Sequence, residues 1–201
     1  DSILNQTYQN FEICLSNDCS TLQETIDTLN EYEKKDSRIK VHHRKENGHI
    51  SKATNDALNI ASGEFIGLMD NDDLLARNAL AECVAVLNKN KELDFIYTDE
   101  DKLSMDGEFY FEPHFKSDYN LFRLRDNNYI CHIFVVKKAL VNQVGGLRPE
   151  FDGSQDYDFI LRCCEQAKQV IHIPKVLYHW RCHMNSVAAN PESKTYAYEA
   201  G

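Results

Sequence analysis

Short apolar runs alternate with amphipathic segments along the first half of the chain. The apolar runs predict strands over residues 11–16, 39–43 and 65–69. Apolar residues at helical spacing predict helices that begin near Leu22 and that cover residues 50–61 and 76–87. Strands that alternate with helices are typical of βαβ units. The pattern therefore predicts an α/β fold with a doubly wound, mostly parallel central sheet.

The pattern is weaker in the second half of the chain. Further strands are expected at residues 95–98, 109–111, 133–136, 171–174 and 176–180, and helices over 138–144 and from 157 onward. Residues 1–7 look like the last turns of a helix, and Pro191 is expected to open a final helix. No internal repeat or clear linker interrupts the chain, which predicts a single domain over residues 1–201.

One acidic loop stands out, because Asp70, Asp72 and Asp73 follow directly after the predicted strand at 65–69. In an open α/β sheet, ligands bind beyond the carboxyl ends of the strands. Carboxylates this close repel one another, and a divalent cation with oxygen ligands would relieve the repulsion and could also hold phosphates. The alternative is that the loop turns the chain and caps the next helix. The spacing alone favours neither interpretation.

Charge and cysteine content narrow the function classes. The net charge of −10 argues against nucleic acid as a partner, because phosphate binding requires clustered Lys and Arg. Seven cysteines occur without a CxxC pair, which indicates reduced thiols in a cytoplasmic protein. His179 and His183 have the spacing of metal ligands, but no cysteine pair accompanies them, so a zinc site is not predicted.

Four motifs occur in the order found in the inverting family 2 glycosyltransferases with a GT-A fold, and the chain resembles that family. They are residues 16–21 (like VDDxST), 47–55 (like NxGISxAxN), 70–73 (like DxD) and 153–158 (like the (E/Q)D motif). Residues 177–183 are similar to the YxWRxH ending of the family, and residues 97–102 to a bacterial branch that builds surface polysaccharides. The resemblance implies a nucleotide-sugar-binding half over 1–103 and an acceptor and catalytic-base half over 104–201. It also implies that the chain is a fragment that lacks the family's first strand and ends within a helix.

The resemblance assigns the nucleotide and metal residues. Asp18 would accept a hydrogen bond from the base, and Asn17 stands where the family more often has Asp. Asp70 would contact the ribose or the metal, and Asp72 would bind Mn²⁺ or Mg²⁺ at the diphosphate. Ser51 and Asn55 would lie near the nucleotide, and His183 and Arg181 would reach the diphosphate or the metal. For Arg181 and His183 the alternative is a surface position at the end of a strand.

The resemblance also implies that Asp156 is the general base, which takes the proton of the acceptor hydroxyl. The alternative for Asp156 is the N-cap of the following helix. Trp180 would be a platform for sugar stacking or a core residue. Five further residues would face the donor sugar or the acceptor, the alternative for the acidic ones being a solvated turn: Gln155, Asp99, Glu100, Asp101 and His132.

The expected function is transfer of a sugar from a UDP- or dTDP-sugar to a hydroxyl of a polysaccharide or lipid-linked glycan. The enzyme would work in the cytoplasm, at the inner face of the plasma membrane if other segments associate with it. One alternative is a degenerate domain that binds a sugar nucleotide or a partner without catalysis. Another is a phosphohydrolase with Asp70 as nucleophile, but Leu74 stands where that family has Thr or Val.

Overall fold

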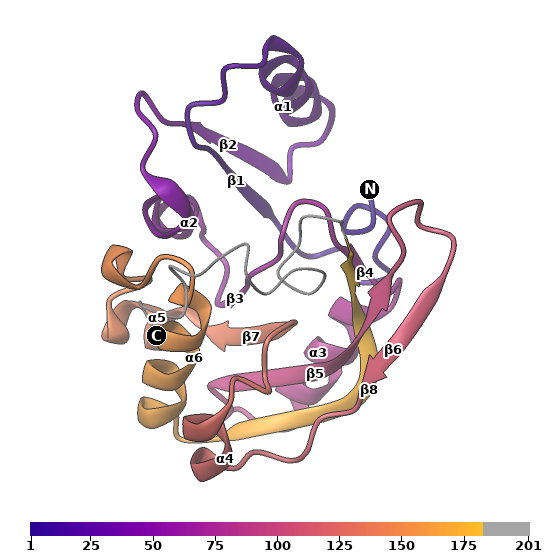
Figure 1. Cartoon of the computed structure of the whole chain (residues 1–201), viewed down its shortest axis with the longest axis vertical. Coiled ribbons are helices and arrows are strands. Elements are labelled where there is room, and N and C mark those ends of the chain that lie inside the picture. The colour runs from indigo at the N-terminus through magenta and orange to yellow at the C-terminus, as the bar shows by residue number, and fades with distance from the viewer. Residues whose placement is uncertain (183–201) are drawn as a thin grey trace.

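Two β-sheets organise the chain in the computed structural model, which describes residues 1–182 (Figure 1). The smaller sheet pairs β1 (Ile13–Asn17) in parallel with β2 (Ile39–His43). Helix α1 (Gln23–Lys35) connects the two strands, and α2 (His49–Ile60) follows β2. The strand–helix alternation predicted for this part of the chain is confirmed. In Figure 1 this part lies above the rest of the molecule.

The larger sheet has six strands in the order β3-β7-β5-β8-β4, with β6 paired to β5. Its strands are β3 (Phe65–Gly67), β4 (Leu74–Leu75), β5 (Phe95–Leu103), β6 (Tyr110–His114), β7 (Phe134–Lys137) and β8 (Val170–Arg181). The remaining helices are α3 (Ala79–Lys89), α4 (Leu121–Asp126), α5 (Lys138–Val144), the short 3-10 helix η1 (Pro149–Phe151) and α6 (Gln155–Gln166).

The α/β fold class is confirmed, but the sheet is mixed rather than mostly parallel. Only β5 and β8 pair in parallel within the larger sheet of residues 1–182, while β3, β4, β6 and β7 pair antiparallel to their neighbours. Parallel pairing requires a long crossover, usually through a helix. The chain from β5 to β6 is a short turn instead, closed by a hydrogen bond from Ser104 N–H to Phe109 O, and it reverses the strand direction.

The core lies on both faces of β5. Phe95 and Tyr97 face one hydrophobic cluster, which contains residues of α5 and α6, and Ile96 faces the other, which contains residues of α3. All three side chains are fully buried. Successive strand residues point to opposite faces, so the first part of β5 is covered on both sides and residues 95–97 form a continuous apolar run.

Several boundaries differ from the sequence-based expectation. Residues 1–7 form turns rather than a helix, because Gln6 is buried and its side chain bonds Ala76 O at 2.8 Å and the Leu80 N–H at 3.0 Å. The acidic residues 99–101 belong to β5 instead of a turn, and β8 is one long strand instead of two. Strand β4 and helix α4 were not predicted. The final helix expected near Pro191 lies outside the described residues.

The two sheets are joined near Glu12 rather than by a common strand. Within residues 1–182, β1 pairs with β2 and β3 pairs with β7, and no strand lies between β1 and β3. The carboxylate of Glu12 accepts hydrogen bonds from the Ser62 and Gly63 N–H groups, at 2.5 and 2.8 Å, just before β3. None of the helices in this part of the chain is both long and apolar enough to cross a membrane.

Candidate active site

The acidic loop after β3 is held against the end of β8. Asp70 is exposed, Asp72 is half-buried and Asp73 is buried. Asp73 accepts hydrogen bonds from the Tyr178 hydroxyl and, at 2.7 Å, from the Arg181 N–H. Burial raises the pKa of Asp73, the neighbouring Asp70 and Asp72 carboxylates add to the rise, and the two hydrogen bonds oppose it.

The alternative in which the acidic loop, through Asp73, caps the next helix is wrong. Helix α3 begins at Ala79, and Asn78 occupies its N-cap position. Asp73 instead fixes the loop, which leaves Asp70 exposed beside it. Two carboxylates at positions i and i+2 supply the hard oxygen ligands that Mn²⁺ or Mg²⁺ prefers.

Arg181 bonds the backbone of this loop and that of the turn between β5 and β6. Its Nε donates to Asp72 O at 2.7 Å, and its Nη1 donates to Met105 O at 3.1 Å in the turn between β5 and β6. The guanidinium therefore lies at the acidic loop, where the sequence placed it, but it is already engaged with carbonyl groups. The third expected metal ligand, His183, lies outside the described residues. Within residues 1–182 no three His, Cys, Asp or Glu side chains converge as a metal cluster.

Asp18 joins the first motif to the second. Its Oδ1 accepts a hydrogen bond from the Gly48 N–H at 2.8 Å and forms an ion pair with Arg44, whose Nε lies 2.9 Å away. Asn17 is buried beside it and contacts His43 Nδ1 at 3.0 Å, while its Oδ1 accepts from the Ser20 N–H. Asn17 thus stabilises the conformation of the loop that follows β1, and Asp18 is the more accessible of the two residues.

Ser51 and Asn55 connect α2 to the segment before α6. The Asn55 amide donates to Leu147 O at 2.8 Å and accepts from the Leu147 N–H at 2.9 Å. Ser51 is completely buried, with its N–H bonded to Asp152 Oδ1 and its hydroxyl to Arg148 O. Ser51 therefore positions α2 and exposes no surface to a ligand.

The expected base lies in the first turn of α6. Ser154 occupies the N-cap position, so the N-cap alternative for Asp156 is wrong. Gln155 folds back and accepts a hydrogen bond from the Gly153 N–H at 2.7 Å. Burial together with the Glu100 and Asp156 carboxylates raises the pKa of the Cys131 thiol, against an opposing effect of Lys116. The Asp156 charge thus acts on Cys131, the residue before His132.

A buried ion pair organises the segment that carries Cys131 and His132. Lys116 has a fully buried ammonium group, which donates to Glu100 Oε2 at 3.2 Å and to Ile130 O and His132 O, both at 2.5 Å. Glu100 also accepts from the His132 N–H at 2.9 Å. Burial alone would raise the pKa of Glu100, but its hydrogen bonds and the nearby Lys116 charge lower it. Lys116 was not predicted from the sequence. A lysine is rarely buried without a partner, and the partners of Lys116 lie on distant segments of the chain.

The acidic residues of β5 do not form a solvated turn. Asp99 is buried and accepts from His172 Nε2 at 2.7 Å and from the Lys116 N–H at 2.9 Å. Asp101 contacts His179 Nδ1 at 2.6 Å. The His132 ring stacks on Tyr178, with its centroid 5.1 Å away. Glu100 pairs with Tyr178 across β5 and β8, and His132 stacks on it, so both residues contact the residue whose side chain holds Asp73. Asp99 instead bonds His172.

Sequence comparison identifies the family of the chain. The family model described as "Glycosyl transferase family 2" matches residues 1–145. The chain belongs to glycosyl transferase family 2. An "O-antigen biosynthesis protein RfbC" of Myxococcus xanthus is 37% identical over 90% of the chain and 14% of the relative. A "Chondroitin synthase" of Pasteurella multocida is 28% identical over 91% of the chain and 19% of the relative.

An uncharacterized protein of Sinorhizobium fredii, y4gI, is 46% identical over the whole chain and 22% of its own length. The chain thus spans less than a quarter of the length of these three curated relatives. Among solved structures, S. aureus TarS 1–349 in complex with UDP-GlcNAc superposes with a TM-score of 0.76 at 23% identity, over 99% of this chain and 58% of that one. A mannosyltransferase from Pyrobaculum calidifontis, in complex with GDP-Man and Mn²⁺, gives a TM-score of 0.66 at 18% identity, over 89% of this chain and 50% of that one. These solved structures establish the GT-A fold of the chain.

Proposed function

We propose that this family 2 domain is an inverting glycosyltransferase that moves a sugar from a nucleotide diphosphate donor to a hydroxyl of a growing glycan. The observation that carries the proposal is the acidic loop, whose exposed Asp70 is set beside an Asp73 anchored to Tyr178 and Arg181. Asp156 stands on the first turn of α6, where its charge acts on Cys131, the residue before His132. The fold and the motifs thus supply a donor side and a base side.

In the proposed reaction, Asp156 accepts the proton of the acceptor hydroxyl while that oxygen attacks the anomeric carbon. The bond from this carbon to the nucleoside diphosphate breaks on the opposite face, so the configuration inverts. Asp18 orients the base of the donor, and Asp70 and Asp72 would hold Mn²⁺ or Mg²⁺. When bound, the metal offsets the negative charge that develops on the leaving diphosphate.

The relatives support a UDP-sugar as the donor and a polysaccharide as the product. The TarS structures contain UDP and UDP-GlcNAc, and two relatives are named for O-antigen biosynthesis and chondroitin synthesis. A dTDP-sugar remains a second candidate, and a lipid-linked glycan a second acceptor. We place the reaction in the cytoplasm, with membrane association through other segments of the protein.

Titration calorimetry on the whole protein tests the donor site. UDP and dTDP are titrated with and without Mn²⁺ into the wild type and the Asp72→Ala variant. Metal-dependent binding of one nucleotide that is lost in Asp72→Ala supports the proposal. Metal-independent binding, or equal binding by Asp72→Ala, contradicts the metal role.

The Asp156→Asn variant tests the base. We expect kcat for transfer to fall by roughly 10²-fold or more, because general-base catalysis contributes about 10²–10⁴-fold, with nucleotide binding unchanged. Glu165→Gln is the matched control, since it makes the same carboxylate-to-amide change at the far end of α6, where Glu165 pairs with exposed Arg125. Transfer by Asp156→Asn at the rate of the control would remove Asp156 from the mechanism. Nucleotide binding by the wild type without any transfer would favour the degenerate domain.

A further inference from the structure

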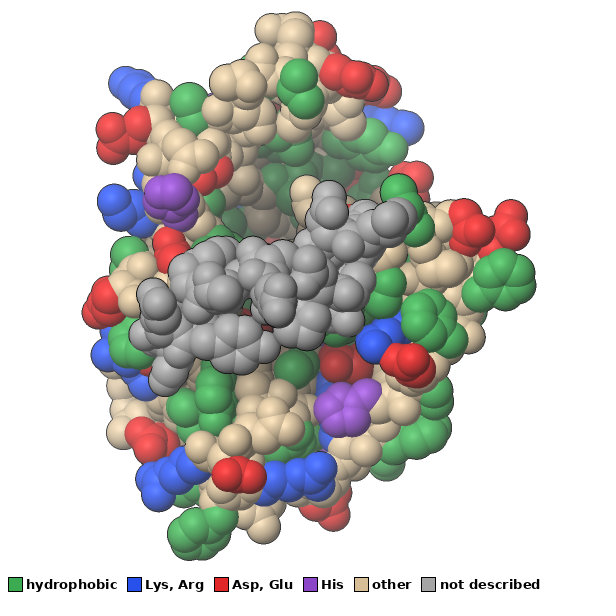
Figure 2. All heavy atoms as spheres, viewed as in Figure 1, with side chains coloured by type: hydrophobic (Ala, Val, Ile, Leu, Met, Phe, Trp, Pro, Cys, Tyr) green, Lys and Arg blue, Asp and Glu red, His purple; other side chains and the backbone are tan. Residues whose placement is uncertain are grey.

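The hairpin of β5 and β6 exposes a group of aromatic side chains. Strand β6 pairs only with β5 in the described part of the chain, and Phe109, Tyr110, Phe111 and Phe115 are all exposed there. Phe109 alone leaves 63% of its surface open to solvent. Figure 2 shows hydrophobic side chains beside Asp and Glu along the right-hand edge, where Figure 1 places this hairpin. Exposed aromatic groups of this size typically mark a binding surface.

Two of these rings share a face of the sheet with the single tryptophan of the chain. Phe111 pairs with Lys102 across β6 and β5, and Lys102 pairs with Trp180 across β5 and β8. Residues paired across strands point to the same face, and Phe109 lies two positions from Phe111. The ammonium group of Lys102 bonds the Glu112 carboxylate within the row. We call Phe109, Phe111, Lys102 and Trp180 the aromatic platform; Trp180 is its inner end, since it is partly buried against the core cluster that contains residues of α3.

The aromatic platform lies on the same sheet face as two buried residues that border the acidic loop, Tyr178 and Glu100. Tyr178 lies two residues before Trp180 on the same face of β8, and its hydroxyl bonds Asp73. Glu100 lies two residues before Lys102 in β5, pairs with Tyr178 and bonds the His132 N–H. A chain molecule that extends from the exposed Asp70 towards β6 would therefore reach the platform.

The chemistry of the hairpin disfavours an added β-strand and an anionic membrane as its binding partner. An added β-strand would need a free N–H ladder, but Pro113 has no N–H and Glu112 has a positive φ of 46° at a register shift. An anionic membrane surface would be repelled by the carboxylates of Asp106, Glu108 and Glu112. Neither polypeptide backbone nor bilayer matches the surface.

A neutral carbohydrate matches the exposed surface of the hairpin. Sugar rings present flat faces of weakly positive C–H groups, which fit the negative faces of aromatic rings, and their hydroxyls bond ammonium and carboxylate groups. We propose that the aromatic platform binds the acceptor glycan several sugar units away from the point of transfer. The inference rests on the proposed function, since it names where that acceptor runs.

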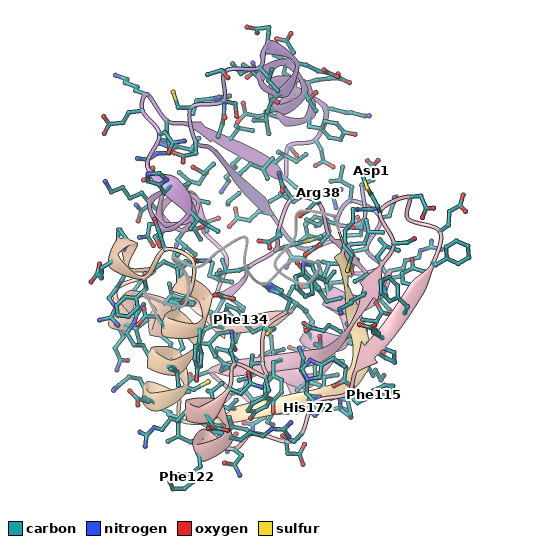
Figure 3. The ribbon with its side chains drawn as sticks, in the orientation of Figure 1. Asp1, Arg38, Phe115, Phe122, Phe134 and His172 are labelled. Carbon is teal, nitrogen blue, oxygen red and sulfur yellow. The ribbon has the colours of Figure 1, made fainter. Side chains whose placement is uncertain are left out.

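Direct glycan binding tests the inference without relying on transfer. The whole protein is titrated with neutral hexasaccharides, chitohexaose and maltohexaose, and with a hyaluronan hexasaccharide for the effect of charge. We expect a neutral hexasaccharide to bind the wild type, and the Phe109→Ser/Phe111→Ser double variant to bind it roughly tenfold more weakly. The matched control is Phe122→Ser, because Phe122 is 81% exposed on α4. Figure 3 labels Phe122 at the lower end of the molecule, away from Phe115 on the hairpin side.

Equal binding by the double variant, or no binding by any of the hexasaccharides, overturns the inference. Loss of binding to phosphatidylglycerol vesicles, or loss of a dimer, in the double variant alone would assign the platform to a membrane or a second copy instead. Titration of the nucleotides with Mn²⁺ tests the proposed donor site separately from the aromatic platform. Failure of the wild type to bind either UDP or dTDP contradicts the proposed donor site, whereas the hexasaccharide result judges the platform by itself.

Discussion

A single buried hydroxyl, that of Tyr178, sets the position of the acidic loop. It donates to the Asp73 carboxylate and accepts from the Asp70 N–H at 3.3 Å. Burial and the carboxylates of Asp73 and Asp70 raise the pKa of Tyr178 well above its ordinary value, so the hydroxyl keeps its proton and remains a donor. The exposed carboxylate of Asp70 is thereby placed by a residue more than a hundred positions away in the sequence.

The Tyr178→Phe variant tests this arrangement. The ring keeps its stacking on His132, but Asp73 loses a buried hydrogen bond, so we expect the free energy of unfolding to fall by about 1–3 kcal/mol. We also expect weaker Mn²⁺-dependent nucleotide binding, because the loop is released. Urea unfolding and titration calorimetry measure the two effects. The control is Tyr119→Phe, which removes a bond to Cys164 O away from the loop, and equal nucleotide binding by both variants would argue against the clamp.

At the scale of elements, α2 and α6 are set relative to each other by the turn after α5. Asn55 of α2 bonds both backbone groups of Leu147, and Gly146 passes directly beneath its side chain. Gly145 and Gly146 both have positive φ, of 88° and 72°. Gly145 is thus required for its backbone conformation alone, whereas Gly146 is required both for its backbone conformation and for the space beside Asn55.

Paired substitutions separate these two requirements. A Cβ on Gly146 would lie 2.5 Å from Asn55 Oδ1, whereas a Cβ on Gly145 would have no neighbour within 4 Å. We expect Gly145→Ala to cost about 1–2 kcal/mol of stability, from the left-handed backbone alone. Gly146→Ala should cost about 1–3 kcal/mol more, because Asn55 must give up its bonds to Leu147, and it should lower kcat by shifting α6. Equal unfolding midpoints for the two variants would refute the role of Asn55.

At the scale of the whole molecule, Glu12 connects the two sheets. Burial alone would raise its pKa, but hydrogen bonds from Lys40, from Ser62 and from the Gly63 N–H lower it from its ordinary value of 4.5 to about 2. A carboxyl whose pKa is lowered in the folded state stabilises that state above the unfolded pKa. The contribution is therefore present at neutral pH and is lost as the pH falls from 4.5 towards 2.

Unfolding in urea as a function of pH tests this connection. We expect Glu12→Gln to be less stable than the wild type at pH 7, and the difference to shrink as the pH falls through this window, because the wild type then loses its charge. Glu31→Gln serves as the control, since Glu31 is exposed on α1 in the same part of the molecule. A difference between Glu12→Gln and wild type that stays constant from pH 7 to pH 3 would contradict the assignment.

The sequence was most informative where structure depends on neighbours along the chain. The helix at 138–144 and the strand at 39–43 appear with the predicted bounds, since periodicity and turn residues act locally. The acidic loop and the start of α6 were also located, because their motifs lie at element boundaries. Residues 99–101 were misplaced, since a run of acidic side chains reads as a turn unless its partners are known.

The tertiary structure alone decided how those pieces meet. Asp99 and Glu100 can lie inside a strand because His172, Lys116 and the His132 N–H reach them from distant segments. Contacts between distant segments also produce the antiparallel pairings, the anchoring of Asp73 by Tyr178 and the row from Phe111 to Trp180. By itself, the sequence determined the local elements, the order of the motifs and the resemblance to the family. Strand pairing and the burial of charge depend on contacts between residues far apart in the chain, which no local pattern specifies.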